Sequence, residues 1–310
     1  MDRIDAMVAF VAAADAGGFS AAARRLGRSP ASITRAIAFL EERTGAQLLR
    51  RTTRVTKLTE AGEHYLVACR RILADLAEAD QLEAGERAVP RGTLSVTAPV
   101  AFGRLHVRGP VDRFLEAHPD VKVRLLLLDR LVNIIDEGID VAIRIAHMPD
   151  SSLTAVRVGE VHRVVCASRE YLARKRQPKE PADLASHDVI SFSQVTPSDQ
   201  WAFATRPGGK PGHVKVRPRM TVNSADVAIG SALEGRGVTC VLSYQIEREL
   251  RDGSLMRIMP SFEPKPLPVH VVYAAASAGS AKVRAFVDLA VPGLKAALAR
   301  RLAPSSSRSR

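Results

Sequence analysis

The residues best suited to chemistry in this sequence are cations and hydroxyl side chains gathered in the first sixty positions. Nine basic and two acidic residues lie between Arg24 and Lys57, which gives that stretch a net charge of +7. Guanidinium, ammonium and hydroxyl groups at this density contact phosphate oxygens and base edges of duplex DNA. The candidate DNA-binding residues are Ser20, Arg28, Ser29, Pro30, Ala31, Ser32, Thr34, Arg35, Arg50, Arg51, Thr52, Thr53 and Arg54.

Three short helices are predicted to position these side chains. The first helix ends at Gly17-Gly18, Ser20 is expected to cap the second, and Gly27 supplies the turn that follows it. Ser29-Pro30 gives an N-cap followed by proline at the first helical position, which predicts the start of a third helix. The core-facing residues of this third helix are Ile33, Ile37 and Leu40. Its opposite face and N-terminal turn are therefore free to enter the major groove.

A two-stranded wing is predicted after the third helix. β-Branched residues alternate with cations between Arg50 and Lys57, which is typical of a strand pair whose basic side chains reach phosphate or an adjacent minor groove. Any single arginine in this stretch could equally well cover a solvated surface. Taken together, the cations favour double-stranded DNA as the partner.

The composition of the whole chain agrees with a polyanionic partner. The 310 residues carry a formal net charge of +12, and 46% of them are hydrophobic, which is enough for two or three domains with buried cores. Three widely separated cysteines, Cys69, Cys166 and Cys240, indicate a reducing compartment without a disulfide framework. With no signal peptide and no run of about 18 apolar residues, a cytoplasmic protein without membrane association is expected.

The charge reverses after the wing. Residues 60–88 contain seven acids and three arginines, so this segment is expected to face away from DNA phosphates. Its apolar positions follow a 4, 3, 4, 3 spacing, which predicts a long helix with a packing seam made of Tyr65, Cys69, Ile72, Leu76 and Ala79. We expect this seam to pair two protomers. The alternative is that it packs on its own chain.

A second region begins after Pro90-Arg91-Gly92. Strand and helix patterns alternate from there, which favours an α/β fold with parallel strands. The expected strands cover 93–97, 121–128, 141–145, 161–167, 238–242 and 269–274. The expected helical segments cover 107–117, 131–137, 225–234, 244–250 and 281–302, and residues 304–310 are expected to form a disordered tail.

The N-terminal residues resemble those of LysR-type transcriptional regulators. The similarity is carried by Gly18 to Gly27, Ser29-Pro30, Thr34 to Arg43, Leu48 to Arg54 and Leu58 to Gly62, in matching order and spacing. Phe39 and Thr44 depart from the family pattern, which bears on local packing near the end of the third helix. A looser similarity continues through residues 138–144 and 235–242.

This resemblance implies an architecture and a set of partners. It gives a winged helix-turn-helix over 1–60, a linker helix over 61–90, and over 91–303 a regulatory domain of the type II periplasmic-binding-protein fold. Subdomain I of that domain would cover about 91–161 and 267–303, and subdomain II about 162–266. The expected protein is a dimeric or tetrameric regulator controlled by a small-molecule effector, with RNA polymerase as a further candidate partner.

An effector cleft is expected where strands end and helices begin. Ligands of open α/β sheets lie beyond the carboxyl ends of the strands, and helix N-termini there favour anions such as a carboxylate. Asn223 and Ser224 could instead only cap their helix, Arg144 could form a salt bridge between subdomains, and Asp129 would oppose an anion unless it is paired. The candidate effector-binding residues are Thr97, Ala98, Pro99, Val100, Arg144, Asn223 and Ser224.

No catalytic or metal-binding pattern competes with these interpretations. The sequence has no serine nucleophile elbow, no His-Glu metal helix and no glycine loop for phosphate, and its histidines never occur at metal-ligand spacing. We therefore expect neither enzyme activity nor a cofactor. A solute-binding protein of similar α/β fold, with no DNA-directed function, is the alternative.

Overall fold

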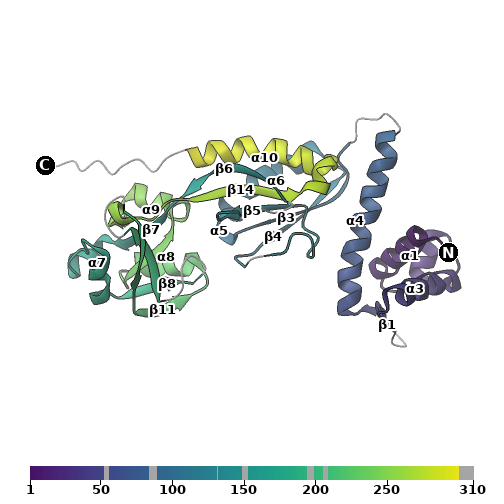
Figure 1. Ribbon diagram of the computed structural model, residues 1–310, viewed down its shortest axis with the longest axis horizontal. Helices are drawn as coiled ribbons and strands as arrows, with labels where there is room; N and C mark the ends of the chain where they lie inside the picture. The colour runs from purple at the N-terminus through teal and green to yellow at the C-terminus, as the bar shows by residue number, and fades with distance from the viewer. Residues whose placement is uncertain are drawn as a thin grey trace.

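The computed structural model describes residues 1–51, 56–83, 89–130, 132–148, 153–193, 199–204 and 209–299. An N-terminal helical unit is followed by one long helix and then by two mixed five-stranded sheets with helices packed on them (Figure 1). The long helix α4 stands between the N-terminal unit and the sheets (Figure 1). The fold is therefore the predicted combination of a winged helix-turn-helix, a linker helix and an α/β domain.

The N-terminal unit consists of three helices and a hairpin. Its elements are α1 (Arg3–Asp15), α2 (Phe19–Leu26), α3 (Pro30–Thr44), β1 (Leu49–Arg51) and β2 (Thr56–Leu58). The Ser29 hydroxyl caps α3 by accepting the Ser32 amide at 3.2 Å, and Gly27 ends α2 with a φ of 63°. The core of the unit includes Ile33, Ile37 and Leu40. The predicted third helix and its core face are confirmed.

One predicted cap is wrong. Helix α2 begins at Phe19, one residue before Ser20, and its N-cap is Gly18. Glycine supplies no capping oxygen, and the exposed Ser20 lies within the first turn. The serine was a plausible cap because it precedes a run of alanines, but the helix extends past it.

The predicted seam lies on helix α4 (Glu60–Glu83), and its two halves differ in burial. Cys69 is fully buried in the N-terminal core, and the Tyr65 ring lies 5.8 Å from the ring of Phe10. Ile72 and Leu76, one and two turns further on, are 37% and 40% exposed. The first half of the seam therefore packs on its own chain, which was the alternative. The Ala79 side chain lies outside the described residues.

The first sheet combines parallel and antiparallel strands in the order β4-β3-β5-β14-β6. Strand β3 is parallel to β4 and β5, whereas β14 runs antiparallel to both β5 and β6. The strands are β3 (Gly92–Ala98), β4 (Val121–Leu127), β5 (Val141–Ile145), β6 (Leu153–Val161) and β14 (Leu267–Ala274). Its helical elements are α5 (Val100–Phe102), η1 (Gly103–Val107), α6 (Arg108–Ala117), η5 (Ala275–Gly279) and α10 (Ala281–Ala299).

The second sheet is also mixed, in the order β11-β8-β12-β7-β13. Its strands are β7 (Arg163–Ser168), β8 (Val189–Phe192), β11 (Pro218–Val222), β12 (Val238–Leu242) and β13 (Leu255–Ile258). A separate hairpin pairs β9 (Gln200–Ala204) with β10 (Pro211–Lys215). The helical elements are α7 (Arg169–Arg174), η2 (Pro181–Ser186), α8 (Ala225–Leu233), η3 (Ser243–Gln245), α9 (Glu247–Asp252) and η4 (Pro260–Phe262).

Several predicted elements of the α/β region need correction. The expectation of parallel strands holds for only part of each sheet. The short helix expected over 131–137 is a turn at 134–138, with Leu131 outside the described residues. The segment 244–250 divides into η3 and α9, and the helix expected from residue 107 already begins at Val100 and contains a π-helical turn. Strands β6, β8, β9, β10, β11 and β13 were not predicted as separate units. The tail at 304–310 lies outside the described residues.

Direct contacts join the two sheets and the helices packed on them. Strand β6 ends at Val161 and β7 begins at Arg163, and between them His162 donates its amide to Ser243 Oγ at 3.1 Å. The Tyr244 ring packs edge-on against Phe102 with 5.2 Å between centroids. An ion pair of 2.8 Å between Arg104 and Asp226 joins η1 to α8. These contacts fix how the two sheet units face each other.

Candidate nucleic-acid interface and ligand cavity

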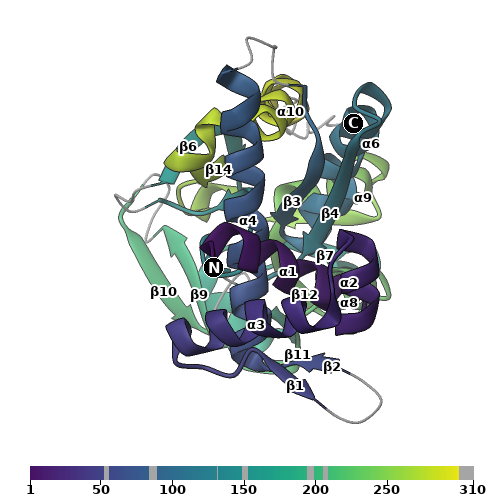
Figure 2. The same ribbon diagram turned by 90° about the vertical axis from the view of Figure 1, so that its right-hand side faces the viewer.

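Helix α3 and the β1–β2 hairpin lie at the same end of the molecule (Figure 2). On α3, Ala31 and Arg35 are exposed, and Ser32 and Thr34 are half-buried. Arg50 on β1 is exposed, as are Ser20, Ser29 and Pro30 near the helix starts. The backbone of Arg51 pairs with Thr56, whereas Thr52, Thr53 and Arg54 lie outside the described residues.

The cations of this region fall into two groups. Arg28 forms an ion pair with Asp5 at 2.9 Å, Arg25 lies 3.7 Å from Asp15, and Arg43 lies over the Phe39 ring. A second group has neither an acidic partner nor an aromatic ring in contact within the described part of the chain, and it consists of Arg24, Arg35, Arg50 and Lys57. Exposed charges without partners are the ones free to meet a polyanion.

The hairpin places two like charges opposite each other. Arg50 on β1 is the register partner of Lys57 on β2, and both side chains are exposed. Like charges in directly opposite strand positions destabilise the pair in the absence of a counter-charge. A row of phosphates would supply that counter-charge.

Glu41 connects the hairpin to α3, a positioning role that the sequence did not predict. Its Oε1 atom accepts the backbone amides of Leu48 at 2.8 Å and Leu49 at 3.1 Å. In the sequence it counts only as one of two acids in a basic segment. Its position in the last turns of a helix, a few residues before a predicted strand, was the only available signal.

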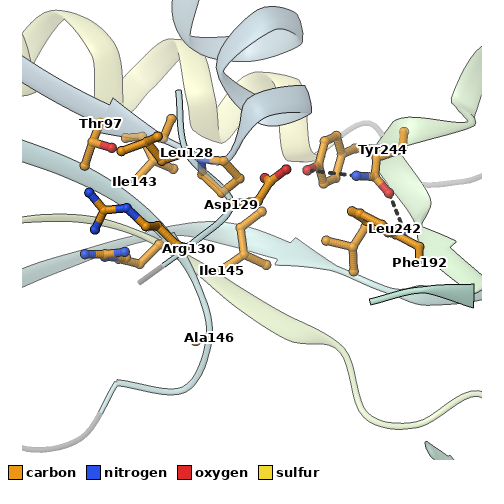
Figure 3. Close-up of a pocket in the computed structure, with 14 residues that line it drawn as sticks. Thr97, Leu128, Asp129, Arg130, Ile143, Ile145, Ala146, Phe192, Leu242 and Tyr244 are labelled. Carbon is orange, nitrogen blue, oxygen red and sulfur yellow. Dashed lines mark hydrogen bonds between the residues drawn. The ribbon is translucent and has the colours of Figure 1, made fainter. Parts of the chain in front are cut away.

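A cavity of about 330 Å³ lies between the two sheet units, at the carboxyl ends of β3, β4, β5, β8 and β12 (Figure 3). Arg130 and Thr97 lie toward one end of it, and Tyr244, Leu242 and Phe192 toward the other, with Asp129 between them (Figure 3). The full lining is Thr97, Ala98, Pro99, Leu128, Asp129, Arg130, Ile143, Arg144, Ile145, Ala146, Phe192, Leu242, Tyr244 and Gln245. This is the volume of a small-molecule site.

Four of the seven candidate effector-binding residues line the cavity, namely Thr97, Ala98, Pro99 and Arg144. Val100, Asn223 and Ser224 are not among its lining residues. The Val100 amide donates to Asp129 Oδ1 at 3.0 Å, so the start of α5 is already occupied by a carboxylate of the chain. Asn223 and Ser224 follow β11, an edge strand of the second sheet, and the Ser224 side chain makes no capping hydrogen bond.

Two arginines supply positive charge to the cavity. Arg130 forms two hydrogen bonds of 2.8 Å with Glu137, and these hold the pKa of that carboxyl below its ordinary value. Arg144 is half-buried, donates to the carbonyl of Val132 and has no ion pair among the described residues. Burial lowers the pKa of Arg144, an effect that the nearby Glu137 partly opposes. A half-buried cation without a hydrogen-bonded acid favours an anionic ligand.

The far wall of the cavity was missed by the sequence analysis. It consists of Phe192, Leu242, Tyr244 and Gln245, and Gln245 Oε1 accepts the Leu242 amide at 2.8 Å. Phe192 and Leu242 are the last residues of the inner strands β8 and β12, and Tyr244 and Gln245 lie just after β12. The end of β12 was readable from its apolar run, but only the sheet order shows that β8 and β12 lead to the cavity.

The described residues were also compared with what a metal site, a reactive cysteine and a membrane-spanning helix require. No group of three His, Cys, Asp or Glu side chains in that part of the chain is placed to hold a metal ion. All three cysteines are buried, and burial raises the pKa of Cys69 to about 11 and that of Cys240 to about 12. Reactive cysteines are accessible and have a lowered pKa, so these thiols lack both features. None of the described helices combines the length and apolar character needed to span a bilayer.

Two family profiles match the chain. Residues 4–63 match the bacterial regulatory helix-turn-helix protein, lysR family, and residues 87–295 match the LysR substrate binding domain. The chain belongs to the LysR-type transcriptional regulators. The regulator therefore has a DNA-binding helix-turn-helix and an effector-binding domain, and the solute-binding alternative is not supported.

Known relatives of this LysR-type regulator align with nearly its full length. It is 29% identical over 290 residues to the transcriptional regulator CrgA of Neisseria meningitidis serogroup B, covering 93% of this chain and 96% of the relative. It is 31% identical over 280 residues to DmlR of Escherichia coli, covering 90% of both chains. The solved CrgA structure aligns with a TM-score of 0.60 at 28% identity, covering 94% of this chain and 98% of that chain.

Proposed function

We propose that α3 and the wing read a specific DNA site and that two protomers pair through α4 on an inverted repeat. Arg35, Arg50 and Lys57, which have no acidic partner among the described residues, support this assignment. The like-charge register pair in the hairpin is its main support. Among the described side chains of α4, Ile72 and Leu76 are exposed large apolar residues available to a partner protomer. A domain division at about residues 60 and 90, cytoplasmic location and contact with RNA polymerase belong to the same proposal.

Replacement of Arg35 by alanine is expected to weaken binding to the preferred site by about 1–3 kcal/mol if its guanidinium reads a base edge. The measurement is a titration against a site selected from random DNA and against unrelated DNA of equal length. Arg43→Ala, at the other end of the same helix, is the matched control and should change affinity little. An equal loss on both DNAs would reassign Arg35 to a phosphate contact.

Salt dependence tests the whole surface. If about six cations per protomer neutralise phosphates, log affinity should fall against log salt concentration with a slope of about −5 per protomer. An affinity independent of salt would refute the assignment of this surface to DNA.

We further propose that the effector is a small carboxylate and that the domain that binds it has no catalytic activity. The main support for this proposal is Arg144. It is half-buried, lines the cavity and has no acidic partner among the described residues. The apolar side chains of Ile143, Ile145 and Phe192 would cover the rest of the ligand. If the effector binds one arrangement of the protomers more tightly than another, it shifts the protein toward that arrangement and so alters DNA binding.

Arg144→Met is expected to abolish stabilisation by carboxylates. A carboxylate present at about 100 times its Kd should stabilise the wild-type regulatory domain by about 2.7 kcal/mol, because it binds only the folded state. The experiment is thermal unfolding of the full chain with a panel of aliphatic and aromatic carboxylates. Arg124→Met, an exposed arginine on β4 outside the cavity, is the control and should respond like the wild type. Stabilisation of the Arg144 variant to the wild-type extent would disprove the role of this arginine.

A further inference from the structure

The turn at residues 132–139 lies between the ligand cavity and helix α4. Ile134 and Ile139 anchor it in a small apolar cluster with Ala142 of β5 and Val272 of β14. The amide of Gly138 donates to the carbonyl of Ile135 at 3.3 Å, and that of Ile139 to the carbonyl of Ile134 at 2.9 Å. These are the two hydrogen bonds of a Schellman motif, with Gly138 in the left-handed region at a φ of 60°. The turn is therefore a compact, hydrogen-bonded unit.

On the cavity side, the turn is held by the two cavity arginines. Arg130 forms its pair of 2.8 Å hydrogen bonds with Glu137, near the end of the turn. Arg144 donates to the carbonyl of Val132, at the beginning of the turn. Both arginines also line the cavity. The groups available to an anionic ligand are thus the same groups that hold the turn.

On the other side, the turn contacts the linker helix. A Cβ atom at Gly138 would overlap Cγ1 of Val67 and would lie 3.6 Å from its Cβ, so the Gly138 backbone packs directly on the Val67 side chain. Val67 lies on α4 between Leu66 and Cys69, which are both buried in the core of the DNA-binding unit. Helix α4 therefore contacts the DNA-binding core and the turn through neighbouring residues. The placement of α4 between the two units is visible in Figure 1.

We propose that the turn 132–139 couples the cavity to the linker helix, with Glu137 as the positioning residue. An anion in the cavity competes with Glu137 for Arg130 and with the Val132 carbonyl for Arg144. Release of either contact loosens the turn and changes how Gly138 packs on Val67. The proposed coupling rests on the proposed function in one respect: the effector must be an anion. Because coupling between two sites is reciprocal, fixing α4 on DNA would change ligand affinity by the same factor.

The coupling can be tested in the full-length chain without any ligand. Glu137→Gln removes the charge that holds Arg130 and imitates its capture by an anion. Amide hydrogen exchange of residues 66–70 should accelerate at least threefold in this variant. Glu160→Gln, which removes the exposed Arg157–Glu160 pair of 2.7 Å on β6, is the matched control and should leave these amides unchanged. Unchanged exchange in β7 and β12 of the second sheet would show that the variant is folded.

A double-mutant cycle with Val67→Ala separates coupling from a merely local change. If the effect of Glu137 passes through Val67, exchange at residues 66–70 in the double variant should equal that of Val67→Ala alone. Acceleration factors that multiply would overturn the proposal, because the two sites would then act independently. Acceleration of the turn amides alone, with α4 unchanged, would also overturn it.

The two proposals fail in different experiments. If carboxylates bind elsewhere or not at all, the Arg144→Met experiment fails while the ligand-free cycle still decides the coupling. If sodium benzoate stabilises the wild type through Arg144 and exchange in α4 does not respond to it, the anion site stands and the coupling is refuted.

Discussion

Replacement of Gly62 by alanine should lower the opening free energy of the N-terminal unit by about 3 kcal/mol and reduce specific DNA binding with it. A Cβ at this position would overlap the carbonyl oxygen of Leu48 and lie 2.9 Å from its carbonyl carbon. That carbonyl cannot easily move, because it accepts the Thr59 amide at 3.0 Å. Helix α4 and the base of the hairpin would therefore separate.

Amide hydrogen exchange at Ile33 and Ile37 measures this opening free energy directly, since both residues are buried in the core of the unit. Gly230→Ala is the control: Gly230 is also helical, on α8, and a Cβ there meets nothing within 4 Å. This change should be neutral or stabilise its helix by up to about 1 kcal/mol. An opening free energy of the Gly62 variant within about 0.5 kcal/mol of wild type would contradict the close approach of the two backbones.

The N-terminal unit was predictable because its signals are local. Ser29 and Pro30 act on the turn in which they occur, and Gly27 takes the left-handed conformation that its own turn requires. The seam of α4 was only half predictable, because a heptad pattern says that a face is buried and not by what. Cys69 is covered by the same chain, whereas Leu76 is left open.

The cavity was less predictable because its walls depend on the order of strands. Thr97 and Arg144 are the next-to-last residues of β3 and β5, two inner strands of the first sheet, and both line the cavity as a strand-end argument expects. The same argument applied to Asn223 leads to an edge strand, away from the cavity. Tyr244 had no signal of its own, since its role depends on which strands are central. The part of each candidate residue in binding stays a prediction.

Asp140→Ala should lower the free energy of unfolding of the first sheet unit by about 2–3 kcal/mol. The Asp140 carboxylate accepts the Ser95 amide at 2.7 Å and lies 3.4 Å from Lys282 Nζ, which in turn donates to the Thr93 carbonyl at 2.7 Å. The side chains of Asp140 and Lys282 are only 17% and 16% exposed. Alanine would therefore leave an amide of β3 without its acceptor and an ammonium of α10 without its counter-charge.

Asp120→Ala is the matched control for burial. Asp120 forms an ion pair with Arg91 at 3.8 Å near the same strand, but the two side chains are 67% and 59% exposed. Solvent screens such a pair, so its loss should cost under about 0.5 kcal/mol. Urea unfolding monitored by exchange in β3 would measure both variants. Equal losses would contradict the prediction, because the buried contacts of Asp140 would then contribute no more than a solvent-screened ion pair.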